Sequence, residues 1–174
     1  MAFFACDTPD VLSVKSKGMA LAVGTAAPDF TLKTKNAEGL HDITLSSHKG
    51  NDNVVLLWFP AAFTGVCTKE FCDLSGGIHN LPGATVYGVS CDSAFAQEGW
   101  AKAEGITVTL LSDYEHKTTE AYDVVLPDLA GLGPASKRAA FVIDKAGIIR
   151  YSEETATPGD LPNFAAILEV LQTL

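Results

Sequence analysis

Short apolar runs alternate along the chain with segments in which apolar residues recur at helical spacing. The run NVVLLWFP at 53–60 places six apolar residues before a proline, and its Val and Trp content is typical of a strand buried on both faces. Two further runs of this kind lie at 84–91 and 107–113. Each run is followed by a segment that favours a helix, and these segments are 65–80, 93–103 and 116–123.

Shorter patterned segments at the two ends complete the set of elements. Two strand candidates, 30–33 and 42–45, precede the first buried run, and segments 138–144 and 147–153 are typical of a hairpin. Residues 161–174 carry apolar residues at helical spacing and predict a closing helix. This order of strands, β–α–β–α units, a hairpin and a helix predicts an α/β fold with a mixed central sheet flanked by helices.

Length and composition indicate how the chain divides into domains. The 174 residues fit one domain, and 47% apolar with 19% charged residues is a globular composition. Residues 1–18 are weakly patterned. We therefore predict an N-terminal extension at 1–18, followed by one folded domain at 19–174.

Charge and hydropathy exclude two classes of partner. The net charge is −9 and the 12 basic residues form no dense run, whereas nucleic-acid binding needs clustered Lys and Arg. No apolar run approaches the roughly 18 residues of a membrane span, and the N-terminus lacks the positive region of a secretory signal. Four cysteines (Cys6, Cys67, Cys72 and Cys91) are too few and too scattered for a disulfide scaffold. We expect a cytoplasmic, reducing location and neither nucleic acid nor membrane as a partner.

The candidate chemistry lies just past the first buried run, at Cys67. If the following helix begins near Gly65, Cys67 lies in its first turn, where unpaired N–H groups and the helix dipole favour an anion. The thiolate, which is the nucleophilic form of cysteine, is such an anion. Full ionisation of an ordinary thiol accelerates its reaction only about 30-fold at neutral pH. Larger acceleration needs groups that stabilise charge in the transition state.

Four other residues are candidates to assist Cys67. Thr64 offers a hydroxyl at the mouth of the turn, and Arg138 offers a charge at the start of the hairpin, where a surface position is the alternative. Glu70 either pairs with an arginine or complements the helix dipole. Pro60 ends the strand because it lacks a ladder donor, and shielding of the sulfur is a further possible role.

At these residues the sequence resembles the peroxiredoxin family. The stretch PAAFTGVC fits the signature P-x-x-x-T-x-x-C, here Pro60, Thr64 and Cys67, with Glu70 at the next family position. The resemblance covers roughly residues 22–174. Three further segments carry it in order: VGTAAPDFTL, VSCDSAFAQEGW and KRAAFVIDKAGIIRY, the last of which holds Arg138.

The resemblance implies a thioredoxin-like fold and a thiol-dependent peroxidase that needs neither metal nor other cofactor. Its substrates would be hydrogen peroxide and organic hydroperoxides, reduced by Cys67 with formation of a sulfenic acid. The family assigns Thr64 and Arg138 to polarising the peroxide and Pro60 to shielding the intermediate. It also implies a thiol reductant such as thioredoxin, glutaredoxin or glutathione, and a homodimer.

Several thiols are candidates to resolve the sulfenic acid. Cys67 and Cys72 on a regular helix would have Cα atoms about 8–9 Å apart, beyond the roughly 7 Å that a disulfide allows. A bridge between them therefore requires the helix start to unwind; otherwise Cys72 is a packing residue. Cys91 ends a buried strand on the expected active-site side, where packing is again the alternative. An outside thiol would serve if neither reacts, and an intermolecular role for Cys6 is the remaining option.

Two other functions compete with the peroxidase. A thioredoxin-like disulfide oxidoreductase would carry C-x-x-C at the helix start, but Glu70 occupies the second cysteine position. A non-enzymatic zinc-binding module would use Cys67 and Cys72 with His79 or His41, yet C-x4-C is loose ligand spacing and no second close pair follows.

Overall fold

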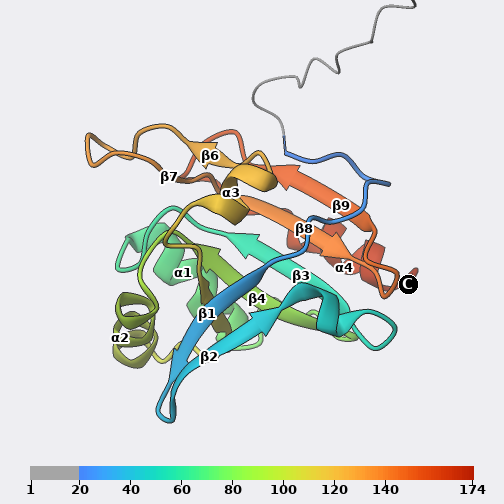
Figure 1. Cartoon of the computed structure of the whole chain (residues 1–174), viewed down its shortest axis with the longest axis horizontal. Coiled ribbons are helices and arrows are strands. Elements are labelled where there is room, and N and C mark those ends of the chain that lie inside the picture. The colour runs from blue at the N-terminus through green and yellow to red at the C-terminus, as the bar shows by residue number, and fades with distance from the viewer. Residues whose placement is uncertain (1–19) are drawn as a thin grey trace, which may run out of the picture.

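The computed structural model describes residues 20–174 and builds them around a seven-stranded mixed sheet (Figure 1). The strand order is β2-β1-β5-β4-β3-β8-β9, with a separate two-stranded sheet β6-β7. The strands are β1 (Thr31–Asn36), β2 (Gly39–Thr44), β3 (Asn53–Trp58), β4 (Ala84–Ser90), β5 (Thr109–Ser112), β6 (Val125–Leu126), β7 (Ala135–Ser136), β8 (Ala139–Ile143) and β9 (Ile149–Glu154). The helices are α1 (Gly65–Ser75), α2 (Ala94–Glu104), α3 (Lys117–Ala121) and α4 (Phe164–Leu171), with a 3-10 turn η1 (Leu45–His48).

The centre of the sheet is β3, which pairs parallel with β4 and antiparallel with β8. All six residues of β3 are buried, because its successive side chains point into two different cores. On one face Val55 and Leu57 pack with side chains of α1, α2 and α4. On the other, Leu56 and Trp58 pack with Tyr122 beside α3 and with the segment before β1. In Figure 1, α3 lies in front of the sheet and α4 behind it.

Most predicted elements are present, with shifted ends. The two early strand candidates are β1 and β2, and they form a hairpin. The helix predicted at 65–80 ends at Ser75, because two glycines follow and the second, Gly77, has a φ of 78°. The closing helix begins only at Phe164, capped by the side chain of Asn163. The short pair β6 and β7 has no counterpart among the predicted elements, since two-residue strands leave no periodic pattern. The predicted extension, residues 1–18, lies outside the described residues.

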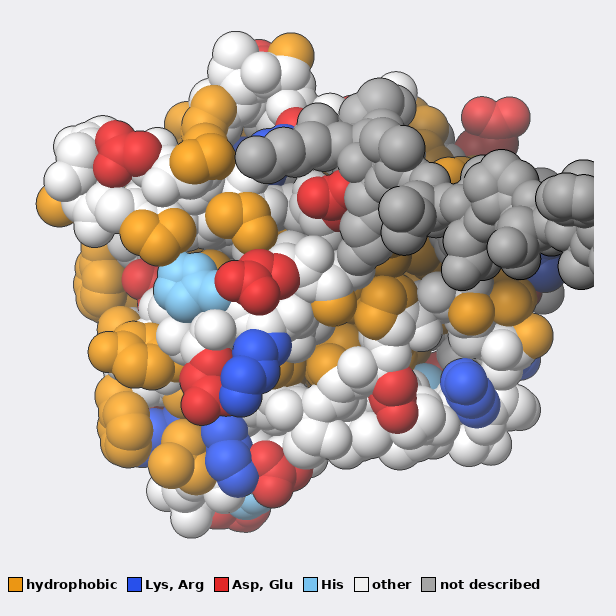
Figure 2. Space-filling view, turned by 45° about the horizontal axis from the view of Figure 1, so that its top comes forward, with side chains coloured by type: hydrophobic (Ala, Val, Ile, Leu, Met, Phe, Trp, Pro, Cys, Tyr) orange, Lys and Arg blue, Asp and Glu red, His pale blue; other side chains and the backbone are white. Residues whose placement is uncertain are grey.

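Most Lys and Arg side chains in the described region form ion pairs with Asp or Glu. Lys33 lies 2.6 Å from Asp42, and Lys117 lies 2.5 Å from Glu115. On the face in Figure 2, Lys and Arg side chains are interspersed with acidic ones and do not merge into one basic patch. No helix between residues 20 and 174 is both long and apolar enough to cross a membrane.

Helix α1 packs closely on the sheet at Gly88, in β4. A Cβ atom there would lie 2.5 Å from Cε1 of Phe71 and 2.7 Å from Cδ2 of Leu110. We expect Gly88→Ala to lower the free energy of unfolding by about 1–3 kcal/mol, because neither neighbour can move away freely. Urea unfolding measures this change.

Gly99 supplies the matched control, because it lies exposed in α2 and a Cβ atom added there would meet no other atom within 4 Å. Gly99→Ala should raise the free energy of unfolding by about 0.5–1 kcal/mol through helix propensity. A Gly88→Ala variant as stable as the wild type would contradict the close approach of α1 to β4.

Candidate active site

The segment between β3 and α1 is held by hydrogen bonds from three other parts of the chain. The N–H of Phe59 donates to the carbonyl of Val89 at 3.0 Å, and the carbonyl of Phe59 accepts from the Ser136 hydroxyl at 2.6 Å. The N–H of Ala62 donates to the carboxylate of Asp92 at 2.8 Å. Within this segment Phe63 has a φ of 61°, a left-handed conformation that non-glycine residues rarely adopt. The geometry of the helix start is therefore imposed by its surroundings.

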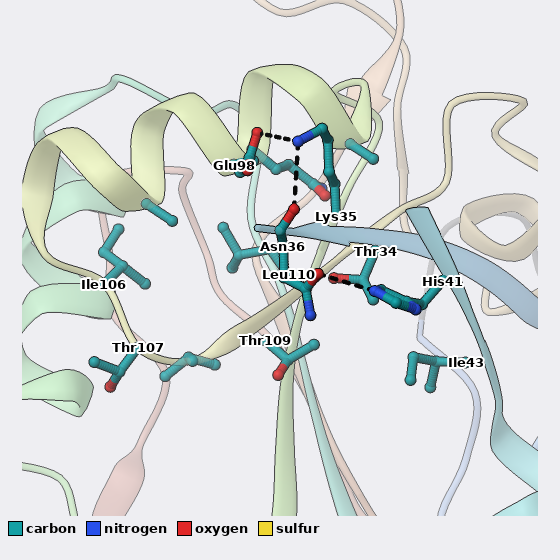
Figure 3. A pocket seen from close by; sticks show the side chains of 14 residues that line it. Thr34, Lys35, Asn36, His41, Ile43, Glu98, Ile106, Thr107, Thr109 and Leu110 are labelled. Carbon is teal, nitrogen blue, oxygen red and sulfur yellow. Dashed lines mark hydrogen bonds and ion pairs between the residues drawn. The ribbon is translucent and has the colours of Figure 1, made fainter. Parts of the chain in front are cut away.

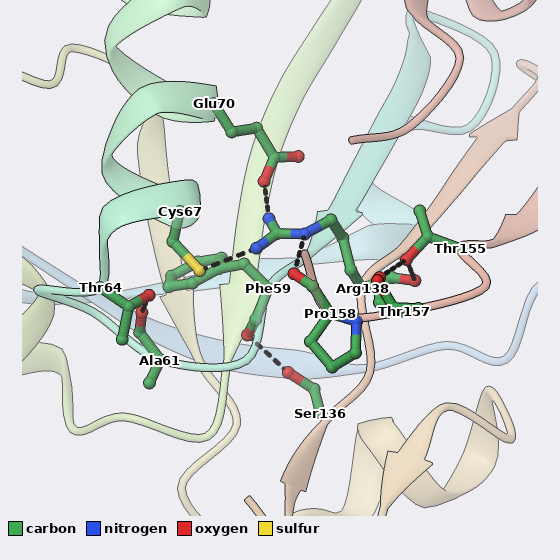
Figure 4. Close-up of polar contacts among 10 residues, drawn as sticks. All are labelled: Phe59, Ala61, Thr64, Cys67, Glu70, Ser136, Arg138, Thr155, Thr157 and Pro158. Atoms are coloured by element: carbon green, nitrogen blue, oxygen red, sulfur yellow. Dashed lines mark hydrogen bonds and ion pairs between the residues drawn. The ribbon is translucent and has the colours of Figure 1, made fainter. Parts of the chain in front are cut away.

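Cys67 lies in the first turn of α1, as the sequence predicts. Thr64 is the N-cap residue of the helix, in extended conformation. The Cys67 side chain is 1% exposed. The Thr64 hydroxyl donates a hydrogen bond to the carbonyl of Ala61 at 2.8 Å. Pro60 is buried in the same segment. Figure 4 shows Thr64 and Cys67 at the same helix start, and Pro60 lies in the segment that leads into it.

Arg138 reaches this turn from the residue before β8. Its Nη2 donates to Cys67 Sγ at 3.1 Å, its Nη1 donates to Glu70 Oε2, and its Nε donates to the carbonyl of Pro158 at 3.1 Å (Figure 4). Arg138 is 1% exposed, so the alternative of a surface charge at a strand end is wrong. Glu70 lies beyond the first turn of α1 and is buried against Arg138. The alternative, that Glu70 complements the helix dipole from the first turn, is therefore wrong as well.

The three side chains form a buried charge cluster. Burial raises the pKa of Glu70 to about 7, and the charge and hydrogen bond of Arg138 act in the opposite direction. The second oxygen of Glu70, Oε1, has no hydrogen-bond partner among the described residues. An arginine beside a cysteine sulfur stabilises negative charge on that sulfur. The arrangement is therefore suited to holding a thiolate in a nearly dry environment.

The other cysteines stand apart from this cluster. Helix α1 runs without interruption through Cys67 and Cys72, and the Cys72 thiol instead contacts the carbonyl of Glu104 at 3.6 Å. Cys91 contacts the Thr119 hydroxyl at 3.7 Å, and burial raises its pKa to about 11. No disulfide joins Cys67, Cys72 and Cys91. Cys6 lies outside the described residues.

Metal ligands are not gathered in the described part of the chain. Between residues 20 and 174 no three His, Cys, Asp or Glu side chains lie close enough to hold a metal ion. His79, a ligand in the zinc alternative, stacks on Phe164 with ring centroids 4.0 Å apart. The zinc-binding hypothesis therefore finds no ligand group in this region.

A separate hollow of about 370 Å³ lies between β1, α2 and β5 (Figure 3). A Lys35–Glu98 ion pair of 2.6 Å and a hydrogen bond of 2.9 Å between His41 and Asn36 lie at its wall. None of the residues around Cys67 lines it. The hollow is thus not part of the candidate active site.

Comparisons with known proteins identify the family. The AhpC/TSA family model matches residues 23–152. The chain belongs to this family. Alkyl hydroperoxide reductase E of Mycobacterium tuberculosis is 34% identical over 145 residues, covering 81% of this chain and 90% of its own. A thiol peroxidase of Listeria monocytogenes is 32% identical over 154 residues, covering 87% and 88%.

Solved structures agree with this AhpC/TSA assignment. A peroxiredoxin-like protein from Aquifex aeolicus superposes with a TM-score of 0.77 at 27% identity, covering 90% of each chain. The resemblance to peroxiredoxins, the thioredoxin-like fold and the thiol peroxidase class are confirmed. The matched residues include Cys67, Glu70 and Arg138, whose catalytic roles stay predictions, and they stop before Pro158.

Three residues that shape this site were not found by sequence reasoning. Asp92, Ser136 and Pro158 contact the segment around Cys67 or Arg138 from distant parts of the chain. In two of these contacts the acceptor is a backbone carbonyl, that of Phe59 or that of Pro158. Every residue type has a backbone carbonyl, so the sequence does not mark such contacts. Only Asp92 and Ser136, polar residues beside apolar strands, carry even an indirect sign in the sequence.

The raised pKa of Glu70 predicts a pH-dependent stability. Because its folded pKa of about 7 exceeds the ordinary 4.5, the folded protein binds this proton more tightly than the unfolded chain. The stabilisation is full below pH 4.5 and is lost as pH rises through 7. We expect Glu70→Gln, which cannot ionise, to lose less free energy of unfolding than the wild type over this range.

Urea unfolding of wild type and Glu70→Gln at several pH values makes this comparison. Glu169→Gln is the matched control, because Glu169 is exposed on α4 and its side chain makes no hydrogen bond or ion pair with the described residues. If the free energies of unfolding of the wild type and Glu70→Gln change in parallel across these pH values, Glu70 does not titrate there.

Proposed function

We propose that the protein reduces hydrogen peroxide and organic hydroperoxides with the thiolate of Cys67. The observation that carries this proposal is the 3.1 Å contact between Arg138 Nη2 and Cys67 Sγ in a site where both side chains are 1% exposed. A cation in contact with a buried sulfur stabilises the attacking thiolate. The name of the mycobacterial relative, an alkyl hydroperoxide reductase, agrees with organic hydroperoxides as substrates.

The proposed first step transfers one oxygen to Cys67. The thiolate attacks the nearer peroxide oxygen, an S–O bond forms and the O–O bond breaks. Sulfur is oxidised to sulfenic acid, and the peroxide is reduced. The leaving oxygen departs as hydroxide or alkoxide and takes up a proton, giving water or an alcohol. The sulfenic acid keeps the proton of the transferred hydroxyl.

Charge in this step develops on the leaving oxygen, and the surrounding donors are placed to stabilise it. The guanidinium of Arg138 is planar, permanently charged and rich in N–H donors. Glu70 holds one edge of it, which leaves the edge at Nη2 for sulfur and peroxide. The Thr64 hydroxyl is released for the peroxide if its bond to Ala61 opens. Pro60, buried and without an N–H, shields the sulfur.

Cys72 or an outside thiol would then resolve the sulfenic acid. The resolving thiol forms a disulfide with Cys67 and releases water, and two thiol equivalents are consumed in each cycle. A Cys67–Cys72 bridge requires the first turns of α1 to unwind and the Cys72 contact with Glu104 to break. Cys91 is the weaker candidate, since a pKa of about 11 keeps its thiol protonated.

Reductant, assembly and location follow from the same proposal. An outside thiol of the thioredoxin, glutaredoxin or glutathione type would regenerate Cys67. We propose a homodimer, as the family resemblance implies, and a reducing, cytoplasmic location. The three free cysteines among the described residues agree with a reducing location.

Mass spectrometry of the oxidised protein tests the chemistry. Within seconds of adding one equivalent of hydrogen peroxide, intact mass and peptide mapping should locate the change at Cys67 in the wild type and nowhere in Cys67→Ser. Loss of two hydrogens mapped to Cys67–Cys72 would establish a two-cysteine cycle. One added oxygen retained on Cys67 would establish dependence on an outside thiol, and an unchanged Cys67 would refute the peroxidase proposal.

The Arg138→Lys variant tests the transition-state role. Lysine keeps the positive charge against Glu70 but lacks the planar fork. We expect the second-order rate constant for oxidation of Cys67 by hydrogen peroxide to fall about 10²–10³-fold, the usual cost of losing an oxyanion donor. Quenched-flow mass spectrometry measures the rate, with far-UV circular dichroism as the folding control. A fall of less than about threefold would contradict the role.

A further inference from the structure

Two of the three guanidinium nitrogens of Arg138 contact α1, and the third contacts a different part of the chain. Nη1 and Nη2 contact Glu70 and Cys67, whereas Nε donates to the carbonyl of Pro158 at 3.1 Å. Pro158 follows β9 and lies outside residues 23–152, which the family model matches. The acceptor of this third contact therefore lies outside the part of the chain that the family model matches.

The segment after β9 also holds the backbone of Arg138. The N–H of Thr155 donates to the carbonyl of Arg138 at 3.0 Å. Three residues later the Pro158 carbonyl reaches the other end of the same residue, at Nε. Figure 4 shows Thr155 and Pro158 on either side of the Arg138 side chain. One loop thus forms hydrogen bonds with both the backbone and the guanidinium of Arg138.

A hydrogen-bonded turn keeps the Pro158 carbonyl in place. The Asp160 carboxylate accepts from the N–H of Thr157 at 2.9 Å and from its hydroxyl at 2.8 Å. The N–H of Asp160 donates to the carbonyl of Thr157 at 3.1 Å, and the Thr155 hydroxyl donates to that carbonyl at 2.8 Å. Residues 156–160 are exposed. Their conformation therefore depends on these bonds and not on burial.

We propose that Asp160 is a positioning residue for Arg138. By closing the turn at Thr157, it holds the Pro158 carbonyl against Nε and so fixes the plane of the guanidinium. A guanidinium held at Glu70 alone can pivot about that contact, because the long arginine side chain has several free torsions. A second fixed point at Nε keeps Nη2 directed at the sulfur of Cys67. This inference rests on the proposed function, since it concerns the same reaction at Cys67.

The Asp160→Ala variant tests the inference directly. It removes the carboxylate oxygen that accepts both bonds from Thr157. We expect oxidation of Cys67 by hydrogen peroxide to slow about tenfold, because small misplacements of a catalytic group are costly. Asp160→Asn should restore the rate to within about threefold, because an amide oxygen can still accept from the N–H of Thr157. The matched control is Glu169→Ala, an exposed acid removed from α4, which should react at the wild-type rate.

A double-mutant cycle separates positioning from a general structural effect. If Asp160 acts through the Arg138 guanidinium, Asp160→Ala should change the rate less than about twofold in an Arg138→Lys background. A merely structural role would lower the rate by the same factor in both backgrounds and would overturn the proposal. If Arg138→Lys does not fold, the decision rests on rescue: an Asp160→Asn variant as slow as Asp160→Ala would overturn it.

Failure of this inference is distinct from failure of the proposed function. If Asp160→Ala is oxidised by hydrogen peroxide at the wild-type rate while Cys67→Ser does not reduce peroxide, the positioning role alone is overturned. Peroxide reduction that survives in Cys67→Ser would overturn the proposed function, and the positioning role with it.

Discussion

The buried ion pair between Arg138 and Glu70 is the interaction on which the site depends. Both side chains are at most 1% exposed, and removing two charges from water costs several kcal/mol unless each finds partners. The carboxylate oxygen, the sulfur of Cys67 and the carbonyl of Pro158 together supply partners for all three guanidinium nitrogens. The pair stabilises the fold weakly, because desolvation offsets most of the attraction. Its effect is to fix a cation in contact with a buried sulfur.

The sheet makes this meeting possible. In the antiparallel ladder of β3 and β8, Trp58 lies opposite Ala139, so Arg138, one residue earlier, lies beside the segment that leaves β3. That segment turns directly into α1, which brings Cys67 and Glu70 over the same edge. Close packing of Phe71 on Gly88 fixes α1 against the sheet. A change of register by one residue would turn Arg138 to the other face.

Loops contribute as much to the site as the regular elements do. The strand-to-helix segment is held by Val89, Asp92 and Ser136, and the guanidinium is held by the loop after β9. Binding and catalytic groups commonly lie on loops that a rigid scaffold positions. Here the scaffold is the fully buried pair β3 and β8, and the loops around it determine which groups face Cys67.

The sequence by itself determined the α/β class, the buried strands and the helix start that carries Cys67, because these depend on local periodicity and on a short motif. It also indicated Arg138 through family resemblance, although its pattern alone favoured a surface position. Only the tertiary structure decided that Arg138 is buried on Glu70, since the contact with Cys67 joins residues 71 positions apart. The contact of the Pro158 carbonyl with Arg138 could not be predicted from the sequence either, because a backbone acceptor has no signature in the side-chain pattern. Contacts of this kind follow from how the sheet brings distant loops together.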